Sequence, residues 1–174
     1  MNRIYFLCII LVGYSLFFLL SFPLWYPFLL FSIGLMIGYC FHVIDRFFQV
    51  LFVPDLKVHR QHFLSFFKKG NILDGVLYLI NKVPSASASF YFLLIYFPLA
   101  LYLISSSGSV VGTGLMLGLG LSYSAHFILS YKKVSGVRML YFKQLSSKVS
   151  DADVQKLMSA FVVLFLIVSF FVAL

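Results

Sequence analysis

The sequence predicts an all-α protein: a polytopic transmembrane helical bundle of about five spans, with short amphipathic helices on its cytoplasmic face. The chain is 62% hydrophobic and only 10% charged, whereas soluble domains carry roughly 25% charged residues. Its 13 Lys and Arg and 5 Asp and Glu all lie at Arg3, in residues 45–82 or in residues 132–156. The remaining long stretches have no charged residue, as a bilayer core requires because charge is costly there.

We expect one transmembrane domain over residues 1–174. The apolar run after Arg3 has about nineteen residues, longer than the roughly 7–15 of a signal-peptide h-region, and no Ala-x-Ala-like cleavage site follows it. This run is therefore expected to remain as the first helix, which Pro23 ends. The predicted spans are 4–22, 26–44, 86–104, 110–131 and 151–174, and the predicted cytoplasmic loops are 45–85 and 132–150.

Local signals mark several of these elements. Trp25 and Tyr26, in the turn after the first span, suit the headgroup level of a membrane. Pro98 predicts a kink inside the third span. Ser150 followed by Asp153 is a capping-box pattern, in which the Ser side chain accepts a backbone N–H and the acid favours the positive helix end. The fifth helix is therefore expected to begin there.

The basic residues predict the orientation of the chain. All 13 Lys and Arg lie at the N-terminus or in the two predicted loops, which become cytoplasmic under the positive-inside rule. We expect a multi-pass protein of the cell inner membrane, with the N-terminus in the cytoplasm and the C-terminus outside. The net charge of +8 does not favour nucleic acid as a partner, because the basic residues flank apolar spans.

The first cytoplasmic loop is expected to contain two amphipathic helices, over residues 58–69 and 72–83, the second with Asn71 as N-cap. Residues 138–149 predict a third, in the second loop. Basic amphipathic helices beside spans either lie in the interface against anionic lipid headgroups or pack on the protein's own inner end. The expected partners are membrane lipids, together with a second copy of the chain or another membrane protein.

A short glycine pattern occurs twice, eighty residues apart: Gly34-Leu-Met-Ile-Gly38 and Gly114-Leu-Met-Leu-Gly118. The GxxxG spacing lets two helix backbones approach closely. We expect spans two and four to pack at the centre through these glycines, against each other or against a second subunit. The repeat also suggests that spans one–two and three–four are two parallel copies of one helical hairpin.

Polar residues inside a membrane are candidates for function. His42 and Asp45 are three residues apart, so they share a helix face, and with His126 they form a candidate zinc site. The alternative is that His42 only hydrogen-bonds a nearby carboxylate or carbonyl. Cys8 and Cys40 would strengthen zinc binding, but two cysteines in apolar stretches are more typical of small buried side chains.

Other chemistry has little support in the sequence. His59 and His62 repeat the three-residue spacing in the next loop, where ordinary loop histidines are the alternative interpretation. Glutamate is absent, and the chain has no GxSxG, Walker or HExxH motif. We therefore assign no catalytic residue and expect no cofactor other than that zinc ion.

Two segments carry a family resemblance: residues 105–121, SSSGSVVGTGLMLGLGL, and residues 38–48, GYCFHVIDRFF. They resemble an uncharacterised family of small multi-span membrane proteins of candidate-phyla bacteria. The resemblance implies a second His and Asp, three apart, at the end of span four. This chain has Ser122 and Ala125 at those positions and keeps only the pair in span two. The family implies no known activity.

The function predicted first is a non-enzymatic membrane assembly or scaffold module with a basic cytoplasmic face. One alternative is a membrane-embedded metal-dependent hydrolase that uses His42 and Asp45. The other is a small-solute transporter subunit built from the repeated hairpin, which would have a cavity at the membrane midplane between spans two and four.

Overall fold

A computed structural model describes the protein over residues 3–19, 24–83, 89–106, 109–131, 134, 137–138 and 149–173. These residues form α-helices and one short 3-10 helix, and none of them lies in a strand, so the all-α class is confirmed. The elements, in chain order, are α1 (Arg3–Leu19), α2 (Trp25–Tyr39), α3 (Phe41–Phe52), η1 (Pro54–Leu56), α4 (Lys57–Lys68), α5 (Ile72–Lys82), α6 (Phe90–Ser106), α7 (Val110–Ser130) and α9 (Asp151–Ala173).

The number of helices that could cross a membrane is smaller than the five expected. Within the described residues, two helices are long and apolar enough, Val110–Ser130 and Asp151–Val172. A third is obtained when α2 and α3 count as one bent span. Two other apolar helices, Cys8–Leu19 and Phe90–Ser105, are shorter. The prediction of a helical bundle with membrane-crossing helices thus holds in its coarser form.

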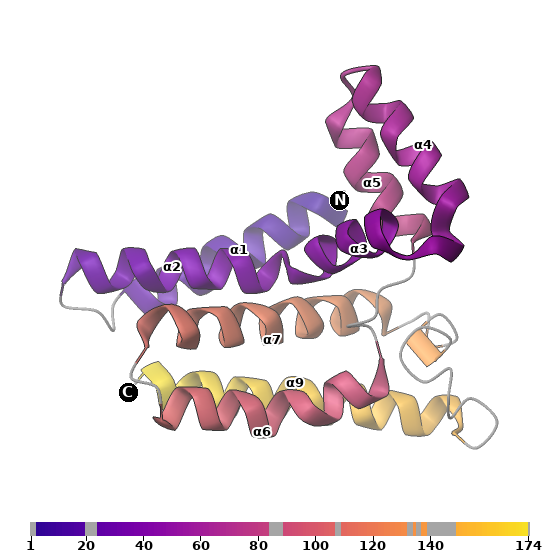
Figure 1. Ribbon diagram of the computed structural model, residues 1–174. Helices are drawn as coiled ribbons and strands as arrows, with labels where there is room; N and C mark the ends of the chain where they lie inside the picture. Colours follow the sequence, from indigo (N-terminus) through magenta and orange to yellow (C-terminus); the bar gives the residue numbers. More distant parts are fainter. Residues whose placement is uncertain are drawn as a thin grey trace.

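Helix α7 lies at the centre of the bundle and packs against α1, α2, α6 and α9 (Figure 1). Most of its residues from Gly114 to Ser130 are buried, including the aromatic rings of Tyr123 and Phe127. Ser109 caps its start by accepting a hydrogen bond from the Gly112 backbone N–H at 3.1 Å. Because α7 contacts helices on several sides, it needs an apolar surface all round rather than one apolar stripe.

The helix expected over the second predicted span, 26–44, is interrupted near its C-terminal end. Helix α2 ends at Tyr39, and α3 leaves Cys40 at an angle of 51° to it. The Cys40 backbone carbonyl accepts hydrogen bonds from the N–H groups of both Val43, at 2.9 Å, and Ile44, at 3.1 Å. The chain therefore restarts as a new helix at this residue. Hydropathy alone did not reveal the break, because the residues around Cys40 are apolar on both sides.

The two amphipathic helices predicted in the first loop are present as α4 and α5. Gly70 connects them with a φ of +74°, a left-handed conformation that suits glycine because it has no Cβ. Asn71 precedes α5, but its side chain makes no capping hydrogen bond, so that part of the prediction is wrong. A small second core joins this hairpin to α3 and consists of Val50, Phe63, Leu79 and Val83.

The start of α9 agrees with the predicted capping box. The Asp153 backbone N–H donates to the Ser150 Oγ at 3.2 Å, and the Ser150 backbone N–H donates to the Asp153 carboxylate at 3.3 Å. Arg138 adds an ion pair with Asp151 at 3.0 Å. Most of the helix predicted over residues 138–149 lies outside the described residues. Helix α6 continues through Pro98 without ending there.

Candidate functional site

The four predicted glycines lie at the contact between α2 and α7. A Cβ built on Gly34 or Gly38 would meet the backbone of Val111 or Leu115, and one built on Gly114 would meet the backbone of Phe31. Gly118 faces the backbone of Leu35 in the same way. Any side chain at these positions would have to push the two helices apart. The glycines therefore pack helix on helix within one chain, at backbone-to-backbone distance.

The contact between α2 and α7 is internally symmetric, because each glycine contact recurs between residues eighty positions away in the sequence. Gly34 faces the Val111 carbonyl, and Gly114 faces the carbonyl of Phe31, which is eighty residues before Val111. In the same way, Gly38 faces the Leu115 carbonyl, and Gly118 faces the carbonyl of Leu35, eighty residues before Leu115. Because both sets of contacts advance in the same direction along the chain, α2 and α7 run parallel. The shared offset gives the predicted duplication a geometric counterpart, which the sequence motif alone lacked.

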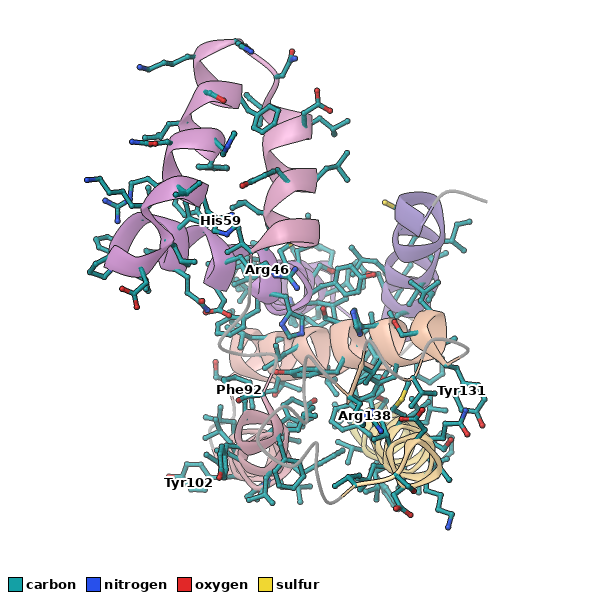
Figure 2. The ribbon with its side chains drawn as sticks, turned by 90° about the vertical axis from the view of Figure 1, so that its right-hand side faces the viewer. Arg46, His59, Phe92, Tyr102, Tyr131 and Arg138 are labelled. Carbon is teal, nitrogen blue, oxygen red and sulfur yellow. The ribbon has the colours of Figure 1, made fainter. Side chains whose placement is uncertain are left out.

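A polar cluster occupies the contact between α3 and α7, and we define it as His42, Arg46 and His126. His42 and Arg46 retain only 9% and 8% of their exposure, although both carry polar side chains. The His42 ring meets the edge of the Tyr123 ring, with centroids 4.5 Å apart. Arg46 and His126 both interact electrostatically with the His42 imidazole. Arg46 lies above α7 in Figure 2, which looks along α6 and α9.

The α3 helix positions this cluster through a four-residue spacing. His42, Arg46 and Val50 are its buried residues, and residues four apart project from the same face of a helix. Sequence reasoning selected His42 but missed Arg46 and the Tyr123 ring. The sequence places Arg46 only among the basic residues of the predicted cytoplasmic loop 45–85. The spacing of His42, Arg46 and Val50 was the available signal, but it becomes meaningful only once α3 is known to be a separate helix.

Asp45, the third residue of the predicted zinc site, takes part in a different contact. Its carboxylate accepts a hydrogen bond from the Gln49 Nε2 at 3.1 Å, one turn further along α3. Its charge still acts on His42, but less strongly than those of Arg46 and His126. The structure therefore brings His42 and His126 together, with a guanidinium beside them. That neighbour is unfavourable for a cation.

His59 and His62 belong to the α4–α5 hairpin. The His59 Nδ1 is hydrogen-bonded to the Tyr78 hydroxyl at 2.8 Å. The His62 ring packs on the same Tyr78, with centroids 6.0 Å apart. Both histidines thus join α4 to α5, as aromatic and hydrogen-bonding contacts of the hairpin. Tyr78 was not selected from the sequence, and nothing in its spacing distinguishes it from other tyrosines.

Metal binding at these residues has no support from the described part of the chain. No three His, Cys, Asp or Glu side chains within it are grouped so that they could hold a metal ion. Cys8 and Cys40 are both exposed and reduced, and both interact electrostatically with Tyr39. Cys40 directly precedes α3, two residues before His42. The zinc site of His42, Asp45 and His126 remains a prediction.

The tip of the α4–α5 hairpin, defined as residues 68–73, exposes polar and apolar side chains together. Lys68 and Lys69 are exposed there. Ile72 and Leu73 follow them with 58% and 70% of their surface exposed. The sequence predicted amphipathic helices but not this location. Phe63 faces the small core inside the hairpin, whereas Val58 and Leu64 of α4 are also exposed, at 65% and 43%.

The hairpin projects sideways from the bundle. In Figure 1 it stands across the direction of α6 and α9, and in Figure 2, where those two helices are seen end-on, it still extends away from them. The two views agree, so the hairpin lies roughly perpendicular to α6 and α9. If these helices follow a membrane normal, a hairpin in this direction runs along the membrane surface.

Comparison with known proteins adds no family to this geometry. No protein-family model, curated protein or solved structure matches the chain.

Proposed function

We propose that this protein is a non-enzymatic scaffold module of the inner membrane, and that the tip of its α4–α5 hairpin rests on anionic lipid headgroups at the cytoplasmic face. The observation that carries this proposal is the sideways hairpin, whose tip exposes two lysines beside Ile72 and Leu73. Interfacial segments combine these two features, because apolar side chains enter the headgroup boundary while lysines pair with anionic lipid.

The proposed topology has five crossings, with the N-terminus inside. It rests on the positions of the 13 Lys and Arg, all of which are then cytoplasmic. Helix α1 and the bent pair of α2 and α3 would be the first two crossings, and α6, α7 and α9 the others. Helix α6, with 17 residues, is short for a roughly 30 Å hydrocarbon core. Local thinning of the bilayer accommodates a short span at modest cost.

The two alternative functions have less support. A transporter built from the repeated hairpin needs a midplane cavity between α2 and α7, but their backbones meet at all four glycines. A metal-dependent hydrolase needs a ligand set, and Arg46, four residues from His42 on the buried face of α3, brings a positive charge toward the residue that would bind the metal. The close glycine contact within one chain also removes the need for a second subunit at this surface. A lipid-contacting scaffold is therefore the function that we propose.

A fluorescent label at the hairpin tip tests this proposal. We would replace Leu73 with Cys in a Cys8→Ser, Cys40→Ser background, attach an environment-sensitive dye, and reconstitute the full chain in nanodiscs. In discs containing phosphatidylglycerol we expect blue-shifted emission and quenching by nitroxide-labelled lipid. Gln61→Cys, an exposed position on α4, provides the matched control and should show neither effect.

Neutralising the lysines supplies the second arm of this experiment. Lys68→Gln with Lys69→Gln should weaken the response of the Leu73 label in phosphatidylglycerol by the equivalent of roughly 2 kcal/mol, because each lysine near an anionic surface contributes about 1 kcal/mol. Emission from the Leu73 position that is the same in nanodiscs and in detergent would refute contact of the tip with lipid.

A further inference from the structure

An apolar crevice lies between α6, α7 and α9, on the side of the bundle away from the glycine contact. Its volume is about 160 Å³, and carbon atoms make up nearly all of its lining. Phe127 of α7 forms part of its lining, between Leu94 and Phe97 of α6 and Ala160 and Leu164 of α9. Leu94 and Leu164 are 61% and 49% exposed, so the crevice is open to the surroundings along its length.

The crevice exists because α6 and α9 each pack on α7 and meet mainly through one ring. Phe161 of α9 contacts Phe97 and Tyr96 of α6, with ring centroids 4.9 and 5.6 Å apart. The residue before it on α9 is Ala160, whose methyl group is too small to fill the space beside Phe161. A slot therefore remains between the two helices where a larger side chain would have closed it.

The surroundings determine what can occupy this slot. Helix α9 is one of the two helices that are long and apolar enough to cross a membrane, and α6 is apolar throughout. A slot without polar atoms holds water poorly, because water needs two to four hydrogen-bonding partners. In a bilayer the molecules that meet an outward-facing apolar slot are lipid acyl chains. An acyl chain also restores the dispersion contacts that an empty slot lacks.

The charge of Lys156, near one end of the crevice, determines which lipid headgroup fits there. Lys156 is exposed and lies four residues before Ala160 on α9, so it borders the same face near the start of the helix, one turn after Asp151 and Asp153. Lysine side chains on helices point toward the N-terminus and snorkel to the headgroup level. Asp153 also lies on this face, but its carboxylate accepts hydrogen bonds from both the hydroxyl and the backbone N–H of Ser150. The ammonium of Lys156 is thus the group placed to meet a lipid phosphate.

We infer that this crevice is a binding site for one anionic phospholipid of the leaflet on the basic side, with an acyl chain against Phe127 and Ala160 and the phosphate near Lys156. The site is separate from the hairpin tip and requires only that the chain is inserted in a membrane, which is part of the proposed function. Lipid bound here would join α6 to α9, whose direct contact is otherwise limited.

Native mass spectrometry of the full chain in mild detergent tests this site, with dioleoyl phosphatidylglycerol and dioleoyl phosphatidylcholine as probes. We expect one molecule of phosphatidylglycerol to be retained by the natural protein. Ala160→Trp should fill the slot and remove that molecule. Ser159→Trp adds the same ring at the neighbouring exposed position, which does not line the crevice, and should leave the retained lipid in place.

The headgroup is tested by Lys156→Gln. We expect the preference for phosphatidylglycerol over phosphatidylcholine to fall about fivefold, which is the equivalent of roughly 1 kcal/mol for one lysine. Leu164→Trp is a second filling variant for the case that Ala160→Trp does not fold, as judged by its circular dichroism. Retention of the lipid by a folded filling variant, or its loss from Ser159→Trp, would overturn the site.

These outcomes are separable from the proposed function. Ala160→Trp should leave the nanodisc response of the Leu73 label unchanged, because the crevice and the hairpin tip belong to different helices. If Ala160→Trp changes neither the emission of the Leu73 label nor the retention of lipid, the crevice site alone is rejected. Failure of the chain to insert into nanodiscs would reject the proposed function instead.

Discussion

Gly38 of α2 lies against the carbonyl group of Leu115 of α7, with no room for a Cβ between the two backbones. The same relation recurs between Gly118 and Leu35, eighty residues away in each partner. This pair of contacts holds the centre of the bundle, because it sets the distance at which the remaining side chains of α2 and α7 meet.

Replacing Gly38 with Ala should destabilise the protein, because the added methyl group meets backbone atoms that cannot turn away. We expect a loss of about 1–3 kcal/mol in the free energy of unfolding, and a larger loss for Gly38→Leu. Thermal unfolding in detergent, followed by circular dichroism, measures it. Gly13→Ala is the matched control, since nothing lies within 4 Å of a Cβ at Gly13. That variant should keep or gain stability, because Ala favours helix over Gly.

The symmetry of the contact predicts that Gly34→Ala and Gly114→Ala have similar effects. Each methyl group would meet a backbone carbonyl of the partner helix at an equivalent position. Once one substitution has separated the helices, the second should cost less, so the double variant should lose less stability than the two single losses together. Unequal single losses, differing by more than about 1 kcal/mol, would show that the two halves of the contact are not equivalent.

The capping box at the start of α9 should contribute measurably to that helix. Ser150→Ala removes both the acceptor of the Asp153 N–H and a donor to its carboxylate. We expect a loss of about 1 kcal/mol and faster hydrogen exchange in the first turn of α9. Ala152→Ser provides a control at an exposed neighbouring position. If exchange in the first turn does not change in Ser150→Ala, the capping contacts do not hold the helix end.

The polar cluster predicts that the purified protein carries no zinc. Arg46 lies four residues from His42 on the same buried face of α3, and a bound cation would add to its positive charge. Elemental analysis of protein prepared with zinc in the medium checks this. One zinc ion per chain that disappears in both His42→Ala and His126→Ala would contradict our interpretation and support the hydrolase alternative.

The proposed orientation predicts the location of the C-terminus. A reporter fused after Leu174 should be active only outside the cytoplasm, and one fused in the hairpin at Gly70 only inside it, because basic residues flank Gly70 whereas residues 157–174 contain none. Cytoplasmic activity of the C-terminal reporter would exclude five crossings. It would favour an even number, such as one in which α1 does not cross.

Several local features could be predicted from the sequence because they depend on neighbours along the chain. The capping box is such a feature, since Ser150 and Asp153 are three residues apart. The hairpin helices are another, since their apolar periodicity is visible in twelve residues or fewer. Asn71 failed as an N-cap because the turn through Gly70 sets a backbone conformation that does not direct its side chain to α5.

The polar cluster could be predicted only in part. His42 was found because a polar residue in an apolar stretch is conspicuous, and Asp45 was paired with it by helical spacing. The structure instead pairs Asp45 with Gln49 and places Arg46 beside His42. Which polar groups meet was decided by the direction of α3 after the break at Cys40, where α3 packs mainly against α4 and α5.

The sequence by itself determined the all-helical class, the apolar segments, the position of every charge and the paired glycine motifs. These are properties of single residues and of close neighbours, governed by solvation and by helical periodicity. Only the tertiary structure decided that α2 ends at Tyr39, that the hairpin turns sideways, and that α6 and α9 leave a crevice beside Phe161. Each of these depends on how side chains far apart in the sequence fill the same space.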